Sequence, residues 1–218
     1  MFELNENLDI QQEVFQDTVI YTIDNFFKDP HKILDFMKTA PHTVWKGFEN
    51  PKFNGIHYKY VKIFHHSVEI QPVIDLMMPF FQKGEIQHKG FVLSDFYLRD
   101  PVNNDYKNNY FWPHKDFGFT GVVFLNEYDG PGTNMYHENS MVIRDPSIVP
   151  KSLDPWQSKE NYTLEKVLMS KFNRCIFFDA FKFYHNIAVD DDTWFNEHRY
   201  NVVIHFKHEP IKFYNNGL

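Results

Sequence analysis

The sequence has one cysteine, four arginines and no long apolar run, and each shortage argues against a class of protein. Cys175 cannot form a disulfide within the chain, which indicates a reducing compartment. No block of Lys or Arg occurs and the net charge is −7, so we expect no duplex nucleic-acid partner. The longest apolar run, residues 73–81, is interrupted by Asp75 and is too short to span a membrane. Together with an acidic, polar N-terminus that does not resemble a secretory signal, these features predict a cytoplasmic protein without a membrane partner.

Aromatic residues and histidines, in contrast, are abundant. Aromatic residues make up 18% of the chain and 24 residues are Phe, which is more ring surface than a linker or tail carries. The apolar share of 43% and the charged share of 23% are typical of a globular protein. A length of 218 residues suits a single domain, 1–218, with a sizeable core. The twelve His are candidate metal ligands, because imidazole is the commonest metal ligand in proteins.

The first 90 residues predict one strand and two helices. Residues 18–23 are alternating and β-branched, which is typical of a strand. Asp29 as N-cap and Pro30 at the first helical position predict a helix that ends before Pro41. Residues 67–83 carry apolar side chains at helical spacing and predict a second helix. The stretch between the two helices is rich in aromatic residues and shows no regular pattern.

After Gly90 the pattern changes to short runs rich in Val, Ile, Phe and Tyr, separated by Asn, Asp, Gly and Pro. The runs are FVLSDFYL, YFWPHKDF, GVVFLNEY, TNMYH, RCIFFDA, YHNIAV and RYNVVIHF. This spacing predicts an antiparallel sandwich or barrel over about residues 91–210, and hence an α+β, mainly β fold. Residues 138–171 interrupt the core as an insertion with two Asp-Pro turn signals and a predicted short helix over 162–170. An insertion of this length inside a compact domain is more often a functional lid than filler.

The chain contains one His-x-Asp tripeptide, His114–Lys115–Asp116. Twelve His and 17 Asp in 218 residues give roughly one such tripeptide by chance, so it is uninformative alone. On a strand, residues i and i+2 point to the same face. The imidazole and the carboxylate would then be able to bind one metal ion from one side.

Two later residues make the tripeptide more informative. His185 lies at the start of a strand-like run that follows an FF pair, and Arg199 opens the last run. Two His and one carboxylate suit non-haem Fe(II), and Arg is the side chain best suited to bidentate carboxylate binding. His205 shares the face of Arg199 if the run is a strand. Plain structural roles also remain open to these residues, such as a loop or core histidine, a turn carboxylate or an edge-strand cation.

The ordered set His114, Asp116, His185 and Arg199 resembles the iron(II)- and 2-oxoglutarate-dependent oxygenases, and within them the prolyl-4-hydroxylase-like group. The resemblance covers about residues 91–206. The opening IDNFFKDPHKILDFM also resembles small bacterial and phage members. An LN pair after the first metal-bearing segment, a Gly/Thr turn and the FF run before the second His agree with the same family.

The resemblance implies a double-stranded β-helix, which is a jelly-roll core, with the N-terminal helices packed on it. It implies that His114, Asp116 and His185 bind Fe(II). It also implies that Arg199 pairs with the C5 carboxylate of 2-oxoglutarate, the cosubstrate consumed together with O₂. Asn134 and Tyr97 are weaker candidates for cosubstrate contacts.

The implied activity is hydroxylation of a C–H bond in a peptide, an amino acid or a small metabolite, with release of succinate and CO₂. A phage-encoded member would act in the host cytoplasm. Many members carry Arg-x-Ser where this chain has Arg199–Tyr200–Asn201, which leaves the second cosubstrate contact open. Two alternatives remain: a catalytically idle jelly-roll module for binding or structure, and a nucleic-acid demethylase. Demethylases usually carry a further Arg beyond the cosubstrate Arg, and none follows Arg199.

Overall fold

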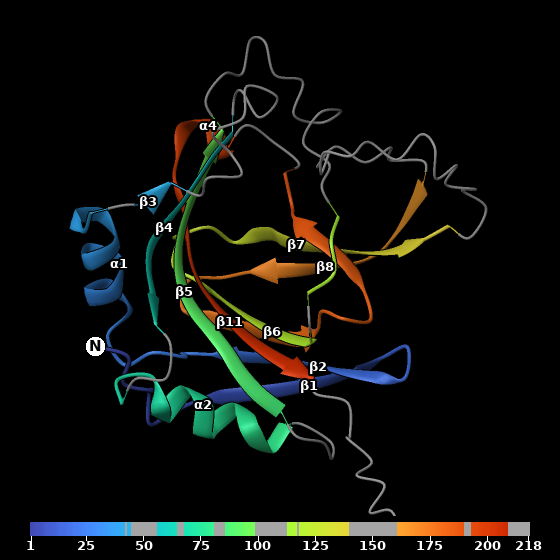
Figure 1. The fold of residues 1–218 in the computed structure, drawn as a ribbon, viewed down its shortest axis with the longest axis horizontal. Coiled ribbons are helices and arrows are strands. Elements are labelled where there is room, and N and C mark those ends of the chain that lie inside the picture. Colours follow the sequence, from blue (N-terminus) through green and yellow to red (C-terminus); the bar gives the residue numbers. More distant parts are fainter. Residues whose placement is uncertain are drawn as a thin grey trace, which may run out of the picture.

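The computed structural model describes two antiparallel sheets and a few short helices (Figure 1). The described residues are 1–41, 43–44, 56–64, 68–80, 86–98, 113–116, 118–139, 161–189 and 193–208. The large sheet has the strand order β1-β2-β9-β6-β11-β5-β4-β3, and the small sheet has the order β10-β7-β8.

The strands of the large sheet come from both halves of the chain. They are β1 (Asp9–Phe15), β2 (Thr18–Asp24), β3 (Thr43–Val44), β4 (Ile56–Phe64), β5 (Ile86–Leu98), β6 (Gly118–Phe124), β9 (Arg174–Asp179) and β11 (Arg199–His208). The small sheet contains β7 (Gly130–Glu138), β8 (Tyr162–Ser170) and β10 (Tyr184–Ile187). From β6 onward the chain passes to the small sheet, back to β9, again to the small sheet and finally to β11. This alternation between two sheets fits the predicted jelly roll.

Side-chain alternation along β9 divides the apolar core in two. Cys175 and Phe177 are buried in a cluster that also contains residues of both N-terminal helices. Ile176 and Phe178 are buried in a second cluster, together with Met135 of the small sheet. The large sheet therefore carries helices on one face and the small sheet on the other (Figure 1).

The first helix, α1 (Pro30–Thr39), forms as predicted. The side chain of Asp29 accepts a hydrogen bond from the backbone N–H of Lys32 at 3.1 Å, which caps the helix. Pro30 occupies the first turn, where its missing N–H has no effect on the helical hydrogen bonds. Ile33 and Met37, four residues apart, face the core.

The second helix is shorter than predicted. It is α2 (Gln71–Met77), followed by the 3₁₀ turn η3 (Met78–Phe80), and not a continuous helix over 67–83. Pro72 lies in the first turn of α2 and Pro79 lies in η3, and each proline lacks the N–H that a helix interior requires. A further short helix, α4 (Thr193–Asn196), precedes β11 and was not predicted.

The predicted helix over 162–170 is wrong, because this segment is strand β8. It pairs antiparallel with β7 over its whole length, from Glu138↔Tyr162 to Gly130↔Ser170. Its local helical preference is overridden by this pairing and by burial of Leu168 between the sheets. The insertion is correspondingly shorter than 138–171. Most of what remains, 140–160, lies outside the described residues, as do both Asp-Pro turn signals and hence the predicted lid.

The first 90 residues contribute strands to the large sheet. β2 pairs with β9 and β4 pairs with β5, so the N-terminal strands extend the large sheet at both ends. Neither β1 nor β4 was predicted. All but the last residue of β1 are exposed, so it lacks the alternating apolar pattern by which a strand is recognised in sequence.

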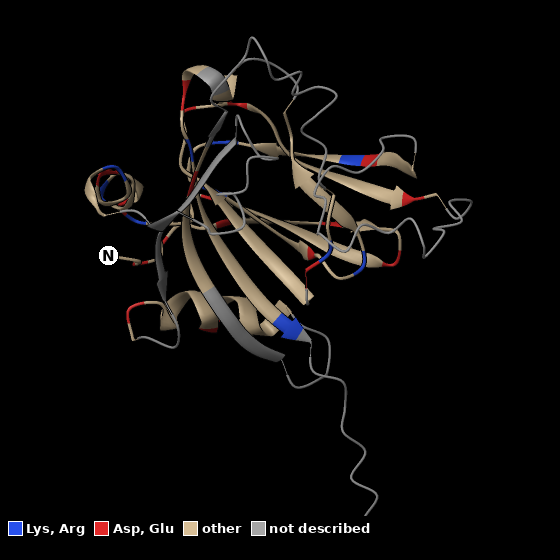
Figure 2. Cartoon of the chain, turned by 45° about the horizontal axis from the view of Figure 1, so that its top comes forward, with Lys and Arg blue, Asp and Glu red and all other residues tan. Residues whose placement is uncertain are grey.

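Among the residues that Figure 2 draws in colour, Lys, Arg, Asp and Glu lie mostly at strand ends, in connections and on α1. Within the part of the chain that the structure describes, no helix is long and apolar enough to cross a bilayer.

Candidate metal centre

The backbone brings His114 and His185 together at the edge of the small sheet. The two residues form an isolated antiparallel bridge in which each N–H donates to the other's carbonyl, at 3.0 and 2.9 Å. The N–H of Asp116 donates to the carbonyl of Ala180 at 3.0 Å. The expected regular strand around His114 is thus a single bridge, and Asp116 is held separately by the connection that follows β9.

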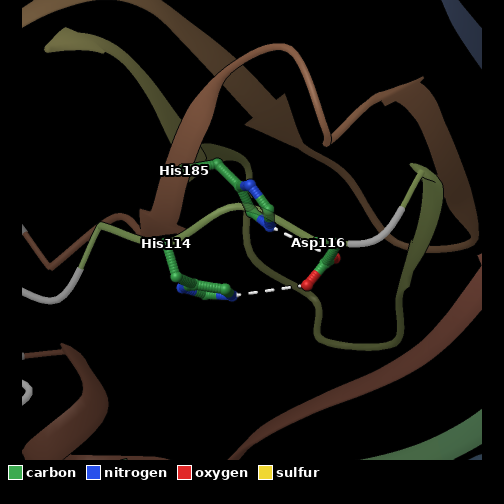
Figure 3. Close-up of side chains that lie close together, drawn as sticks. All are labelled: His114, Asp116 and His185. Carbon is green, nitrogen blue, oxygen red and sulfur yellow. Dashed lines mark ion pairs between the residues drawn. The ribbon is translucent and has the colours of Figure 1, made fainter. Parts of the chain in front are cut away.

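The three side chains converge on one point (Figure 3). The Nε2 atom of His114 lies 3.9 Å from Oδ1 of Asp116, and Nε2 of His185 lies 3.5 Å from Oδ2. One ligand atom from each residue lies within 4.8 Å of the other two. The side chain of His185 is only 8% exposed, whereas that of His114 is 44% exposed. The group therefore has one buried and one open side.

The ring of His185 is oriented by its surroundings. Its Nδ1 faces the carbonyl of Phe183 at 3.4 Å, and a carbonyl accepts but cannot donate a hydrogen bond. In the neutral ring, which is the form that binds a metal, the proton is therefore on Nδ1, and the lone pair of Nε2 is directed toward the candidate metal position beside Asp116. The ring of Phe178 packs edge-on against the imidazole at 5.2 Å between centroids. This is the tautomer and orientation that a metal-binding histidine needs.

Asp116 is held as a carboxylate. The hydroxyl of Thr120 donates to its Oδ2 at 2.6 Å, and Nδ1 of His205 lies 3.4 Å from the same oxygen. Burial raises the pKa of Asp116, but in the metal-free protein hydrogen bonds and positive charge from His185 and His205, when these rings are charged, outweigh burial and bring the pKa below its usual range. Two imidazoles and one anionic carboxylate on one side of a site form a donor set typical of non-haem Fe(II).

Arg199 lies at the start of β11 and is 3% exposed. Its guanidinium donates to the carbonyl of Gly132 at 3.0 Å. The same group packs over the rings of Phe124 and Trp194, at 5.4 and 5.9 Å from their centroids. A buried guanidinium held between two aromatic rings is suited to receive an anion, because its charge is shielded from water and its planar fork is fixed.

Asn201 lies on the same face of β11 as Arg199 and His205, because alternate residues of a strand share a face. It is buried, its Nδ2 reaches Ser94 Oγ only at 3.5 Å, and its Oδ1 has no hydrogen-bond partner. Exchanging the amide O and N would let Ser94 donate to Oδ1 and would free the N–H groups to donate to a ligand. An unsatisfied buried amide beside Arg199 thus fits a site built for a further polar group.

The two weaker candidates are placed differently. Asn134 pairs in register with Asn186, while Met135 pairs with His185. Successive residues of a strand point to opposite faces, so Asn134 and His185 lie on opposite faces of the small sheet. Tyr97 lies in β5, but its side chain is outside the described residues. A cosubstrate contact by either residue stays a prediction.

Sequence reasoning missed Thr120, Trp194 and Gly132. Thr120 pairs in register with His205 across β6 and β11, and this pairing brings both to Asp116. A threonine inside an apolar strand gives no signal of such a role until the strand register is known. His205 was anticipated as a residue on the face of Arg199, although not as a partner of Asp116.

No protein-family model matches the sequence, and no curated protein matches it. Solved structures with a similar arrangement include an oxidoreductase of the 2OG-Fe(II) oxygenase family from Burkholderia pseudomallei, at 9% identity over 82% of this chain and 78% of that chain, with a TM-score of 0.43. The non-heme α-ketoglutarate-dependent epimerase SnoN from nogalamycin biosynthesis matches at 14% identity over 87% and 82%, with a TM-score of 0.47. A Pseudomonas putida prolyl-4-hydroxylase matches at 10% identity over 83% and 100%, with a TM-score of 0.35. At these identities and TM-scores the likenesses do not identify a function, which is inferred below from the site itself.

Proposed function

We propose that this protein is an Fe(II)- and 2-oxoglutarate-dependent oxygenase that hydroxylates a C–H bond of a peptide, an amino acid or a small metabolite. The convergence of His114, Asp116 and His185 within 4.8 Å carries the proposal. The buried Arg199 in the same fold supports it, because a cosubstrate with two carboxylates requires both a metal and a cation.

His114, Asp116 and His185 would hold Fe(II) and leave the remaining positions of the ion open on the exposed side of His114. When bound, Fe(II) with 2-oxoglutarate and O₂ supplies the oxidising chemistry, releasing succinate and CO₂. The chain contributes ligands of fixed orientation. Phe183 fixes the tautomer of His185, and Thr120 donates a hydrogen bond to Oδ2 of Asp116.

Arg199 would bind the C5 carboxylate of 2-oxoglutarate, with Asn201 in its alternative amide orientation as the second contact. Phe124 and Trp194 exclude water from the guanidinium, which strengthens its attraction for an anion. Asn201 takes the position at which many members of the resembled family carry serine.

An anaerobic titration tests the metal and cosubstrate sites together. Adding 2-oxoglutarate to the Fe(II)-loaded protein is expected to produce the weak visible charge-transfer band of the chelate, and admitting O₂ is expected to yield succinate. Asp116→Ala is expected to lose the band and succinate formation, because one of three ligands is removed. If the wild-type protein binds Fe(II) but shows neither band nor succinate, the oxygenase proposal fails and an idle binding module is favoured.

The Arg199 variants test the cosubstrate cation separately. Removing one partner of a buried charge pair costs on the order of 2–5 kcal/mol, or roughly 30- to several-thousand-fold in 2-oxoglutarate affinity. Arg199→Met is therefore expected to bind Fe(II) normally and to require far more 2-oxoglutarate for the band. Arg199→Lys is expected to restore only part of the affinity, because an ammonium cannot replace the planar fork. An Arg199→Met variant that titrates like wild type would remove Arg199 from the site.

A further inference from the structure

We propose that Thr120 and His205 are positioning residues that jointly hold one oxygen of Asp116, so that the other oxygen is presented to the metal. The inference rests on the metal-binding part of the proposed function, but not on the identity of the cosubstrate or substrate. Neither residue belongs to the group of three that converges on the candidate metal position.

Both residues converge on Oδ2 of Asp116. Thr120 Oγ1 lies 2.6 Å from Oδ2, and His205 Nδ1 lies 3.4 Å from the same oxygen. His205 Nδ1 also lies 3.3 Å from Thr120 Oγ1. The three groups form a closed triangle of polar contacts of 2.6 to 3.4 Å, and Thr120 is 2% exposed.

The direction of each hydrogen bond follows from the donors available. A threonine hydroxyl has one proton, and a carboxylate can only accept, so Thr120 donates to Asp116. The oxygen of Thr120 is then an acceptor for its remaining neighbour. His205 must therefore carry its proton on Nδ1 and donate it toward Thr120 and Asp116.

The triangle belongs to the large sheet and to the segment that leads into it, whereas the histidines of the site lie at the edge of the small sheet. Thr120 and His205 are direct register partners on β6 and β11 of the large sheet. Asp116 precedes β6, and its backbone N–H is bound to Ala180, after the end of β9. The two histidines of the site lie on the bridge at the edge of the small sheet. Thr120 and His205 thus fix the carboxylate relative to histidines that a different sheet carries.

The two oxygens of the Asp116 carboxylate have different neighbours. Oδ2 lies 3.5 Å from Nε2 of His185, but it also receives the hydrogen bond of Thr120 and the contact of His205. Oδ1 faces Nε2 of His114 at 3.9 Å and is the oxygen that Thr120 and His205 leave for the metal. We infer that Oδ1 is the ligand atom and that Asp116 binds through this one oxygen. Loss of a residue that orients a metal ligand typically lowers metal affinity by 10- to 100-fold.

The test is equilibrium binding of Mn(II) to the metal-free full-length protein, followed through the EPR signal of free Mn(II). Thr120→Val removes the hydroxyl at nearly constant shape, and Thr120→Ser retains it. His205→Leu removes the donor, and His205→Asn provides an amide N–H near the position of Nδ1. Thr22→Val, on β2 of the same sheet but away from the site, is the matched control.

We expect Thr120→Val and His205→Leu to weaken Mn(II) binding by about 10- to 100-fold each. Thr120→Ser, His205→Asn and Thr22→Val are expected to remain within about threefold of wild type. The double variant Thr120→Val/His205→Leu is expected to lose less than the product of the single losses, because both act on one oxygen. Thermal unfolding of each metal-free variant identifies any that fail to fold. If Thr120→Val fails to fold, Mn(II) affinity is measured for Thr120→Ser combined with a change at His205. If His205→Leu fails to fold, it is measured for His205→Asn combined with a change at Thr120.

Unchanged affinity in folded Thr120→Val and His205→Leu would overturn the inference, even if Asp116→Ala abolishes binding and the oxygenase proposal stands. If His205→Asn loses as much affinity as Asp116→Ala, His205 is a ligand and the positioning role is wrong. Wild-type protein that binds no Mn(II) contradicts both proposals. Wild-type protein that shows the predicted variant pattern but forms no chelate with 2-oxoglutarate supports the positioning role and overturns the oxygenase proposal.

Discussion

Asn173 joins the N-terminal segment to the turn between β8 and β9 through a single amide. Its Oδ1 accepts from the N–H of Phe27 and its Nδ2 donates to the carbonyl of the same residue, both at 2.8 Å. Its φ of 60° places it in the left-handed region, which Asn tolerates better than most residues. One buried side chain thus completes a pair of hydrogen bonds that a neighbouring strand would otherwise supply.

Replacing this amide is expected to destabilise the protein. Asn173→Ala leaves two buried backbone groups without partners and puts an alanine at positive φ, so we expect a loss of about 2–4 kcal/mol in unfolding free energy. Asn173→Gly loses the same bonds without the backbone strain and is expected to be about 1 kcal/mol more stable than the Ala variant. Urea unfolding measures both, and an Ala variant as stable as wild type would contradict the assigned role.

Asp24 and Arg174 form a bidentate pair between β2 and β9. Nε of Arg174 lies 2.6 Å from Oδ1 of Asp24, and a second guanidinium nitrogen lies 2.9 Å from Oδ2. The hydrogen bond from Arg174 lowers the pKa of Asp24 below its ordinary value of 3.8, with a smaller contribution from Lys171. The pair is partly buried, which limits screening by solvent.

Because the folded-state pKa of Asp24 is depressed, the pair contributes stability above the unfolded pKa, near pH 4. That contribution is lost as the pH falls through the lower, folded value. Asp24→Asn is therefore expected to cost about 1–2 kcal/mol at pH 7 and progressively less as the pH falls below 4. Urea unfolding at pH 7 and pH 3 compares the variant with wild type. A difference that is the same at both pH values would contradict an ionised pair.

At the scale of elements, β7 depends on the absence of a side chain at Gly132. A Cβ at this position would lie 2.7 Å from Cζ of Phe124 and 3.0 Å from Cβ of Ser170. Phe124 is one of the two rings that hold Arg199, and Arg199 itself donates to the carbonyl of Gly132. The close approach of the two sheets here is thus coupled to the cation of the candidate site.

Gly132→Ala is expected to destabilise the fold by about 1–3 kcal/mol, as overpacking does, and to weaken 2-oxoglutarate binding by displacing Phe124. Gly121→Ala is the matched control on β6, where a Cβ would meet the flexible end of Met77 at 3.1 Å on the helical face of the sheet. We expect the control to keep the affinity for 2-oxoglutarate. Equal losses of affinity in both variants would show that the effect does not act through Phe124.

The strand assignment of β8 predicts slow hydrogen exchange for the amides that bond to β7. β8 is an edge strand, so only alternate amides pair, and its protection is expected to be intermittent along 162–170. A helical segment would instead show contiguous protection after its first turn. Hydrogen exchange followed by NMR distinguishes the two patterns, and contiguous protection would contradict the strand.

At the scale of the whole molecule, ligand binding is expected to stabilise the fold by mass action. The residues proposed to bind the metal lie at the edge of the small sheet and in the connection before β6, and the residue proposed to bind the cosubstrate lies at the start of β11. Binding of both therefore links the two sheets. Mn(II) at 100 times its Kd is expected to add about 2.7 kcal/mol, which corresponds to roughly 5–10 °C in Tm for a chain of this size. Adding 2-oxoglutarate is expected to raise Tm further.

Chelation of the metal should reverse both increases in Tm, the one from Mn(II) and the one from 2-oxoglutarate. Two variants should separate the metal increase from the cosubstrate increase. Asp116→Ala is expected to lose the response to metal and to cosubstrate, whereas Arg199→Met should keep the metal increment and lose the cosubstrate increment. A Tm that is insensitive to Mn(II) in the wild-type protein would argue against the metal centre.

The sequence by itself determined the elements whose pattern is local. The alternating residues of β2, the runs rich in Val, Ile and Phe in β6 and β11, and the Asp29–Pro30 start of α1 are each readable within a few residues. Strand composition, side-chain period and helix capping are properties of the segment itself. The His-x-Asp tripeptide, the later His185 and Arg199 were recognisable for a related reason, since few side chains combine metal and carboxylate binding.

The tertiary structure decided what depends on a partner. β8 is a strand because it pairs with β7, and the exposed β1 is a strand because it pairs with β2. The bridge between His114 and His185 and the contact of Thr120 and His205 with Asp116 are set by strand register, which pairs residues 71 and 85 positions apart. Register follows from the packing of the whole sheet, because a shift of one residue would turn every buried side chain to the opposite face.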